Sequence, residues 1–264
     1  MKYLVTGSDG FIGRNLVDFL LNKNKEVVSI DYPTDLCEVT PGHTGIDIVV
    51  HLAAETDVRQ SLTMPRTTFL RNCQSTLSAL EVARLNNARL IFASSAAAAN
   101  PISPYGASKA AGEALCTAYR ESYSMNITIL RISNVYGPWS INKNSVVSKF
   151  IKNILSGDPV EIYGEGDQTR DFIYVKDVCK SIYNAKDNQV EICTGETVTI
   201  NYIYSYLRSL AQDIGIDTNV THLPSIKGEI KYPYMLEGLR KYLKIEVGLR
   251  KTFNWFSSNY KSDN

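Results

Sequence analysis

Two groups of residues in the chain have the types and the spacing of a reaction centre. Gly7, Gly10 and Gly13 form a glycine loop near the start, and Tyr105 and Lys109 follow about a hundred residues later. A glycine loop of this spacing can hold a dinucleotide, and a tyrosine can move a proton while a nicotinamide moves a hydride. Together the two groups predict redox chemistry at a carbon–oxygen bond.

The glycine loop stands between an expected strand at 3–5 and an expected helix, Phe11–Leu21. Its first glycines let the backbone turn and approach a pyrophosphate, and the third lets the helix pack closely on the strand. The free N–H groups at the helix N-terminus can bind phosphate. For the glycines alone, an ordinary strand–helix turn remains the alternative. The expected cofactor contacts here are Gly7, Gly10, Phe11, Ile12 and Gly13.

Asp31 follows the second expected strand, Glu26–Ile30, about twenty residues after the loop. A carboxylate at this place hydrogen-bonds the adenosine ribose diol and repels a 2′-phosphate. The cofactor is therefore expected to be NAD and not NADP. The alternative is that Asp31 only begins the turn before Pro33.

Small residues follow the third expected strand, Asp47–Leu52, where the backbone must approach the cofactor closely. These are Ala53 and Ala54, whereas Asp35 and Leu36 are weaker candidates for contact with adenine. The further expected cofactor contacts are Tyr32, Asp35, Leu36, Leu52, Ala53, Ala54, Asn72, Ser94, Tyr105, Lys109 and Ile132.

Tyr105 and Lys109 share one helix face if Pro104 begins a helix, because they are four residues apart. A phenol ionises near pH ~10, but an adjacent ammonium and a nicotinamide cation favour the phenolate. Tyr105 is thus a candidate general base, and Ser95 can hydrogen-bond the same substrate oxygen. The alternative is a helix that merely exposes one tyrosine and one lysine.

The composition excludes several classes of partner and site. The chain has 264 residues, a net charge of +1 and no long run of like charge, so neither nucleic acid nor an anionic membrane surface is expected. The first expected strand begins at Lys2, which leaves no room for a signal peptide, and no apolar run approaches the length of a membrane span.

The cysteines and histidines predict no metal site. The five cysteines are scattered and lack a C-x-x-C spacing, which is typical of reduced thiols in a cytoplasmic protein. His51 ends an apolar run and is expected to be a packed core residue and not a ligand. The cysteines are Cys37, Cys73, Cys116, Cys179 and Cys193.

Short apolar runs alternate with helical patterns over the first half of the chain. Such runs predict a parallel sheet covered by helices on both faces, which is the doubly wound, Rossmann-type α/β fold. The expected division is a dinucleotide-binding domain of residues 1–138 with about 172–195, and a smaller C-terminal substrate lobe of 139–171 and 196–264. The expected strands are 3–5, 26–30, 47–52, 89–93 and 127–132.

Five motifs give the chain a specific resemblance. It resembles an extended short-chain dehydrogenase/reductase of the NAD-dependent sugar-nucleotide epimerase/dehydratase family, over nearly its whole length. The motifs are Val5-Thr-Gly-Ser-Asp-Gly-Phe-Ile-Gly13, Asp47-Ile-Val-Val-His-Leu-Ala-Ala54, Ser103-Pro-Tyr-Gly-Ala-Ser-Lys109, Leu130-Arg-Ile-Ser-Asn-Val-Tyr-Gly-Pro138 and Thr169-Arg-Asp-Phe-Ile-Tyr-Val-Lys-Asp177.

The resemblance implies roles for several residues. Ser95, Tyr105 and Lys109 would be catalytic. Asn134 would contact the substrate together with Ser95, and Arg170 would bind its diphosphate, which suits the planar fork of a guanidinium. Tyr163 would lie near the nucleotide base. A homodimer is also implied, held by the helices that follow Asn72 and Tyr105, of which Ala107–Ala118 is rich in small residues.

Three departures from the family pattern bear on the substrate. Between Asp31 and Asp47 there is hardly room for the usual strand–helix pair. The substrate-contacting segment between Ser95 and Tyr105 is short, and Lys227-Gly-Glu-Ile stands where relatives often have a second diphosphate-binding arginine. Fold and cofactor survive these changes, whereas substrate identity stays open.

The expected reaction is epimerisation at C4 of a UDP-sugar through a 4-keto intermediate, which makes the protein an isomerase. A dehydratase needs an acid–base pair after the catalytic hydroxyl residue, and Ala96 and Ala97 cannot move protons. A nucleotide-sugar reductase stays open, although Asp31 argues mildly against one that uses NADPH. A catalytically idle protein that binds a dinucleotide or sugar nucleotide also stays open.

Overall fold

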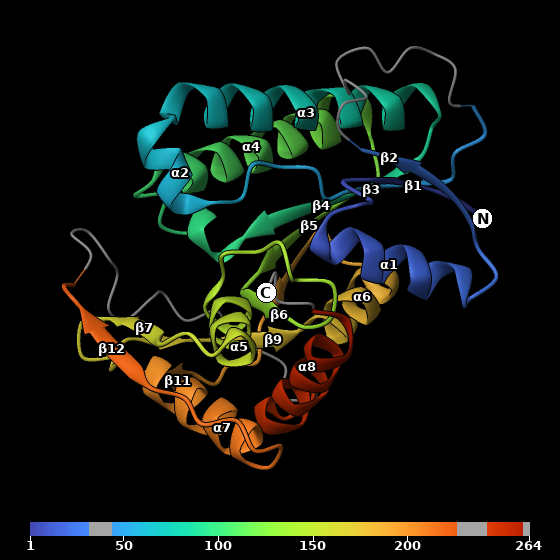
Figure 1. Cartoon of the computed structure of the whole chain (residues 1–264). Coiled ribbons are helices and arrows are strands. Elements are labelled where there is room, and N and C mark those ends of the chain that lie inside the picture. The colour runs from blue at the N-terminus through green and yellow to red at the C-terminus, as the bar shows by residue number, and fades with distance from the viewer. Residues whose placement is uncertain (32–43, 226–241, 261–264) are drawn as a thin grey trace. The chain divides into compact units, whose positions relative to one another are not determined.

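The computed structural model describes residues 1–31, 44–225 and 242–260 (Figure 1). The chain divides into two compact units. Unit 1 comprises Met1–Ile132 and Val178–Ile192, and unit 2 comprises Ser133–Asp177 and Cys193–Asn264. Over the described ranges, no helix is both long and apolar enough to cross a membrane.

Unit 1 is built on a parallel sheet of six strands in the order β10-β5-β4-β3-β1-β2. This confirms the predicted doubly wound α/β fold. The strands are β1 (Lys2–Thr6), β2 (Glu26–Ile30), β3 (Ile48–His51), β4 (Arg89–Ser95), β5 (Ile127–Ile132) and β10 (Gln189–Ile192).

Helices cover both faces of this sheet, which is why its central strands are continuously apolar. All four residues of β3 are buried, for example. In Figure 1, α3 and α4 lie on one face, and α1 and α6 lie on the other. The helices are α1 (Phe11–Leu21), α2 (Val58–Thr63), α3 (Pro65–Leu85), α4 (Pro104–Tyr123) and α6 (Val175–Asn184), of which α6 belongs to unit 1 from Val178 on. A short 3-10 helix, η2 (Ala96–Ala98), joins β4 to the segment before α4.

Helix α4 packs closely on the sheet because it carries a glycine at the contact. A Cβ built on Gly112 would lie 2.5 Å from Cζ of Phe92, a fully buried residue of β4. Phe92 and Cys116 belong to one core cluster, together with Leu4, Val49 and Leu90 from three strands. This contact fixes the height of α4 above β4.

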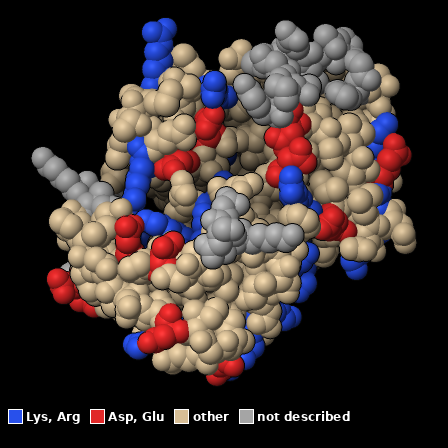
Figure 2. Space-filling view, viewed as in Figure 1, with Lys and Arg blue, Asp and Glu red and all other residues tan. Residues whose placement is uncertain are grey.

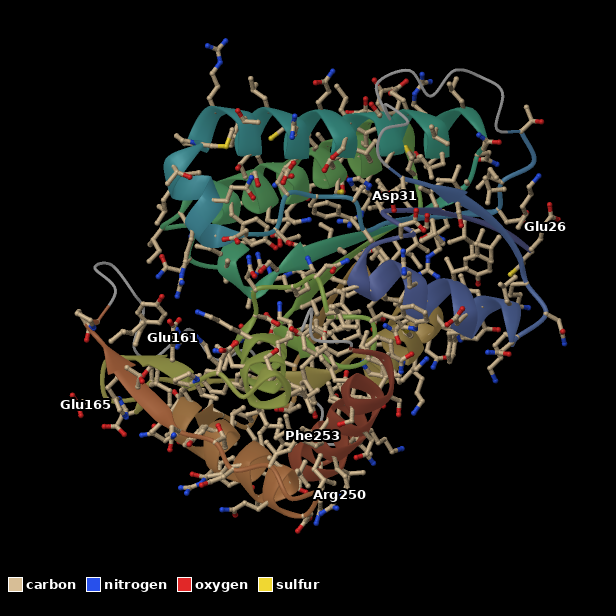
Figure 3. All side chains as sticks on the ribbon, in the orientation of Figure 1. Glu26, Asp31, Glu161, Glu165, Arg250 and Phe253 are labelled. Carbon is tan, nitrogen blue, oxygen red and sulfur yellow. The ribbon has the colours of Figure 1, made fainter. Side chains whose placement is uncertain are left out.

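Within the described residues, unit 2 has its own core, formed between helices and short strands. Phe253 of α8 (Figure 3) is buried in it. Two-stranded sheets pair β11 with β8, β12 with β7 and β6 with β9. The elements are β6 (Asn134–Tyr136), α5 (Val146–Ser156), β7 (Val160–Tyr163), β8 (Thr169–Arg170), β9 (Phe172–Tyr174), β11 (Val198–Thr199), α7 (Ile200–Gln212), β12 (Val220–Leu223) and α8 (Ile245–Asn259).

Candidate functional site

The register of the parallel sheet brings the candidate cofactor residues of unit 1 to one edge. Thr6 pairs with Ile30 on one side and with His51 on the other, and Ser95 pairs with Ile132. These residues end five of the six strands, so the glycine loop, Asp31, Ala53 and Ser95 all follow at the carboxyl edge. In doubly wound sheets this is the edge that binds ligands.

The glycine loop after β1 has no space for a side chain at Gly7 or at Gly13. Gly7 has a φ of +68°, and a Cβ there would lie 2.8 Å from the backbone nitrogen of Ala53. A Cβ on Gly13 would lie 2.0 Å from the carbonyl oxygen of Gly7. Only glycine satisfies both positions, and the result is a backbone surface that a pyrophosphate can approach.

The N-terminus of α1 offers N–H groups at this surface. Its N-cap residue is Gly10, and within the described chain no side chain caps the helix. A helix N-terminus without a side-chain cap keeps N–H donors and a partial positive charge for an anion. The geometry of the loop and of α1 therefore fits a dinucleotide pyrophosphate.

Asp31 lies directly after β2, beside the loop (Figure 3). Its Oδ2 accepts a hydrogen bond of 2.5 Å from the backbone nitrogen of Asp9. The carboxylate thus braces the glycine loop. Tyr32, Asp35 and Leu36, which were expected to act beside it, lie outside the described residues.

The remaining expected cofactor residues fall into two groups. Leu52, Ala53 and Ala54 form the backbone after β3, where the Ala53 nitrogen donates to Oγ1 of Thr6 at 3.2 Å. Asn72 instead lies buried on α3. Its amide group bonds the backbone of Glu55 and the hydroxyl of Ser108, so its hydrogen-bonding capacity is largely used within the protein. Phe11 and Ile132 are buried, and Ile12 is half-buried.

Tyr105 stands in the first turn of α4, as its sequence position predicts. The helix begins at Pro104, and the Ser103 hydroxyl accepts a hydrogen bond of 3.1 Å from the Gly106 nitrogen. Tyr105 is buried, which raises its pKa above the usual value near 10, and a hydrogen bond with Ser95 lowers it in part. The phenol and the Ser95 hydroxyl therefore form one hydrogen-bonded pair at the carboxyl edge.

Lys109 is buried one turn further along α4. Its Nζ donates a hydrogen bond of 2.7 Å to the carbonyl oxygen of Ala93 and lies 5.0 Å from the centre of the Phe92 ring. Burial lowers its pKa from 10.5 to about 8. Burial is the largest cause acting on the pKa of Tyr105 and raises it. The expectation that an ammonium and a nicotinamide cation together favour the Tyr105 phenolate stays a prediction.

The sequence did not reveal a role for a second charged residue on this helix, Glu113. Its carboxylate accepts two hydrogen bonds from Arg131, at 2.9 and 2.7 Å, and one from the Ser94 hydroxyl at 2.6 Å. Glu113 thereby ties α4 to β4 and β5. In the sequence, the only signal for Glu113 was its place one turn after Lys109. Ser94, which was expected to contact the cofactor, donates its hydroxyl hydrogen to Glu113 instead.

The expected substrate residues Asn134 and Arg170 lie in unit 2, on either side of Asp171 in the β6–β9 region. Asn134 donates from its backbone and from its side chain to the carbonyl oxygen of Asp171, at 3.1 and 3.0 Å. The Asp171 carboxylate in turn accepts from Ser133 and from the backbone of Gly195. Asp171 thus connects the start of β6, where Asn134 lies, with the end of β8, where Arg170 lies.

Tyr163 ends β7 and Arg170 ends β8, which belong to different two-stranded sheets of unit 2. Nη1 of Arg170 donates to the carbonyl oxygen of Thr169 at 2.7 Å. The carbonyl oxygen of Tyr163 accepts from Gln168 at 2.9 Å, and Nζ of Lys149 lies 5.8 Å from its ring centre. Both side chains are half-buried.

The described residues offer no cluster suited to a metal ion, and the one face seen in Figure 2 carries mixed charge. They include no cluster of three or more His, Cys, Asp and Glu side chains that could hold an ion. On the face in Figure 2, acidic and basic side chains are interspersed. His51 is buried in the core, as its sequence position suggested.

The chain is similar over nearly its whole length to UDP-sugar 4-epimerases, among other proteins. A UDP-glucuronate 4-epimerase of Thermodesulfobacterium geofontis is 29% identical, with 97% of this chain and 96% of the relative covered. The structure of UDP-glucose 4-epimerase with UDP-glucose from Thermotoga maritima superimposes with a TM-score of 0.90 at 26% identity, covering 99% of this chain and 100% of that one.

A second solved structure and a family model agree with these relatives. The UDP-glucose 4-epimerase of Thermus thermophilus in complex with NAD gives a TM-score of 0.85 at 28% identity, covering 98% of this chain and 100% of that one. The model of the NAD dependent epimerase/dehydratase family matches residues 3–200, which include the glycine loop, the Tyr105–Lys109 pair and Arg170. The chain belongs to the NAD dependent epimerase/dehydratase family.

Proposed function

We propose that the protein is an NAD-dependent isomerase that epimerises C4 of a UDP-sugar through a 4-keto intermediate. The observation that carries the proposal is the Tyr105–Ser95 pair, which stands at the same sheet edge as the glycine loop. Full-length similarity to UDP-glucose and UDP-glucuronate 4-epimerases supports the choice of reaction.

The cofactor fits the loop between β1 and α1. Gly7 and Gly13 leave the backbone bare for a pyrophosphate, and Asp31 offers a carboxylate to the adenosine ribose. Bound there, NAD would supply the hydride chemistry at C4 of the sugar.

Tyr105 moves the proton that must accompany each hydride transfer. It takes the proton from the 4-hydroxyl group and later returns it to the carbonyl oxygen, while the Ser95 hydroxyl holds the same oxygen. Because burial raises its pKa, Tyr105 needs positive charge close by to act as a base. Lys109, one turn away on α4, would supply that charge as an ammonium held by the carbonyl oxygen of Ala93.

Unit 2 supplies groups suited to a nucleotide sugar. Arg170 can pair with the diphosphate, because a guanidinium forms charge-assisted bonds to two anionic groups. Asn134 offers an amide to the substrate, and Tyr163 an aromatic ring to the nucleotide base. A free sugar gives Arg170 little to bind, so a nucleotide sugar is the better match.

Dehydration is disfavoured by the segment that follows the catalytic hydroxyl. Ala96 and Ala97 begin η2 immediately after Ser95. Neither side chain can transfer a proton, and elimination of water requires both an acid and a base. Epimerisation needs no such pair, since one tyrosine serves both directions.

We infer a cytoplasmic location from the cysteines. Of those that the structure describes, Cys73 and Cys116 are free thiols. Free thiols persist in reducing compartments.

Tyr105→Phe should lower turnover by a factor on the order of 10² or more, the usual contribution of a general acid–base group. NAD affinity and the melting temperature should stay near those of the parent, because only one hydroxyl is lost. Steady-state kinetics and calorimetric titration measure these quantities. Tyr119→Phe is the matched control, since its hydroxyl on the same helix bonds Glu81 away from the reaction centre. Near-parental turnover of Tyr105→Phe would remove Tyr105 from the mechanism.

Asp31 should make the protein bind NAD much more tightly than NADP. A hydrogen bond to a charged group contributes about 1.5–3 kcal/mol, which is roughly a 10- to 150-fold change in affinity. Asp31→Asn should reduce this preference, because the amide oxygen can still accept from the Asp9 nitrogen while the charge is gone. Titration calorimetry with both dinucleotides tests it, and equal affinities in the parent would leave Asp31 with a role in the turn only.

Arg170→Ala should weaken UDP-sugar binding by about one to two orders of magnitude, with NAD affinity unchanged. Arg208→Ala, at an exposed position on α7, controls for loss of charge from unit 2. Melting temperature and UDP-sugar affinity are measured on the same preparation. A lowered melting temperature with unchanged affinity would show that Arg170 only braces the unit.

A homodimer should form through α3 and α4, with a second copy covering the exposed apolar side chains of α3. Leu70 and Leu77 are seven residues apart, so they share a face, and they are 52% and 42% exposed. Leu70→Glu combined with Leu77→Glu should give a monomer by light scattering at micromolar concentration. Ile214→Glu, at an equally exposed apolar position of unit 2, should leave the dimer intact. A monomeric parent protein would contradict the proposal.

A further inference from the structure

A buried histidine at the carboxyl edge of the sheet has both ring nitrogens engaged. His51 ends β3 and is 1% exposed. Its Nδ1 lies 2.7 Å from Oγ1 of Thr6 on β1, and its Nε2 lies 3.3 Å from Oγ1 of Thr76 on α3. Its ring stacks on Phe92 of β4, with centroids 5.9 Å apart. The imidazole therefore joins three strands and one helix at the candidate site.

The partners of the two threonines assign the direction of each hydrogen bond. The Thr76 hydroxyl donates its single hydrogen to the carbonyl oxygen of Asn72 at 2.8 Å, so it accepts from Nε2–H of His51. Nδ1 then carries no hydrogen and accepts from the hydroxyl of Thr6. Oγ1 of Thr6 in turn accepts from the backbone nitrogen of Ala53.

A neutral ring is required by this pattern, since Nδ1 is an acceptor. Burial, reinforced by the positive charge of Lys109, lowers the pKa of His51 to about 3. The ring is accordingly neutral at neutral pH. A buried imidazole with a ring nitrogen that lacks a hydrogen-bond partner would destabilise the fold, which explains why both nitrogens have partners.

The chain of hydrogen bonds continues from α3 to the catalytic helix. Nδ2 of Asn72 donates to Oγ of Ser108 at 2.9 Å, and the Ser108 hydroxyl donates to the carbonyl oxygen of Tyr105 at 2.8 Å. At the other end, the Ala53 backbone lies against Gly7, where a Cβ would be 2.8 Å from the Ala53 nitrogen. A directed series of hydrogen bonds, with one covalent step through Asn72, thus runs from Ala53, which lies against the glycine loop, to the backbone of Tyr105.

We propose that His51, fixed as the Nε2–H tautomer, is a positioning residue that couples the dinucleotide loop to the helix carrying Tyr105 and Lys109. Its two hydrogen bonds hold β1 and α3 at one spacing, so that the backbone around Gly7 and Ala53 is set in relation to Tyr105. The proposal depends on NAD binding but not on the identity of the sugar.

The test measures NAD affinity by calorimetry in single and combined variants. Thr6→Val removes the bond next to the loop and should weaken NAD binding about two- to tenfold, the range of one neutral hydrogen bond. Thr76→Val is on the far side of the ring from the loop, and it should weaken NAD binding by a similar factor because His51 transmits the loss. In a His51→Phe background, which keeps a ring on Phe92, Thr76→Val should have no further effect.

The matched control for Thr76→Val is Thr117→Val. Thr117 makes the same kind of hydrogen bond to the carbonyl four residues earlier, but on the exposed side of α4, so its loss should leave NAD affinity unchanged. An equal effect of Thr76→Val in the parent and in His51→Phe would overturn the coupling, and so would no effect in the parent.

A second measurement needs no variant and holds even if His51→Phe fails to fold. Nitrogen-15 NMR of the parent protein labelled at histidine should show His51 with a protonated Nε2 and a bare Nδ1 throughout the neutral pH range. The opposite tautomer, or a ring that exchanges between the two, would contradict the directed chain.

Discussion

The arrangement of the site depends on one buried ammonium. Lys109 is buried inside unit 1, and its Nζ donates a hydrogen bond to the carbonyl oxygen of Ala93. A buried charge is stable only where polar partners replace its hydration. The carbonyl at the end of β4 and the face of Phe92 do so, and this fixes the depth at which α4 meets the sheet. Tyr105, one turn earlier, is placed as a consequence.

Several further contacts maintain that depth. Gly112 lets α4 approach the Phe92 ring, and Glu113 binds Arg131 and Ser94 on two neighbouring strands. The His51 ring also stacks on Phe92, so the aromatic side chain that receives the ammonium also contacts the proposed link to the glycine loop. Cofactor loop and catalytic helix are therefore parts of one packed arrangement.

The sequence predicted the features of the fold and the site that depend on short-range residue spacing. The glycine loop, the alternation of strands with helices and the Tyr105–Lys109 turn all follow from short-range patterns, and the sheet confirms the fold. Contacts between residues far apart in the sequence could not be predicted from it. Nothing near Asn72 in the sequence indicates that its amide is occupied by Glu55 and Ser108, 17 and 36 residues away. The orientation of Lys109 toward Ala93 likewise depends on packing, and so does the dominance of burial in the pKa of Tyr105.

The most direct measurement of the proposed reaction follows one hydrogen atom. The NAD-loaded protein is incubated with UDP-glucose carrying deuterium at C4, and the nucleotide sugars are then analysed by mass spectrometry and NMR. If hydride leaves C4 and returns to the opposite face without meeting water, the C4 epimer forms with its deuterium retained. An epimer that has exchanged its C4 deuterium for solvent hydrogen would contradict this account.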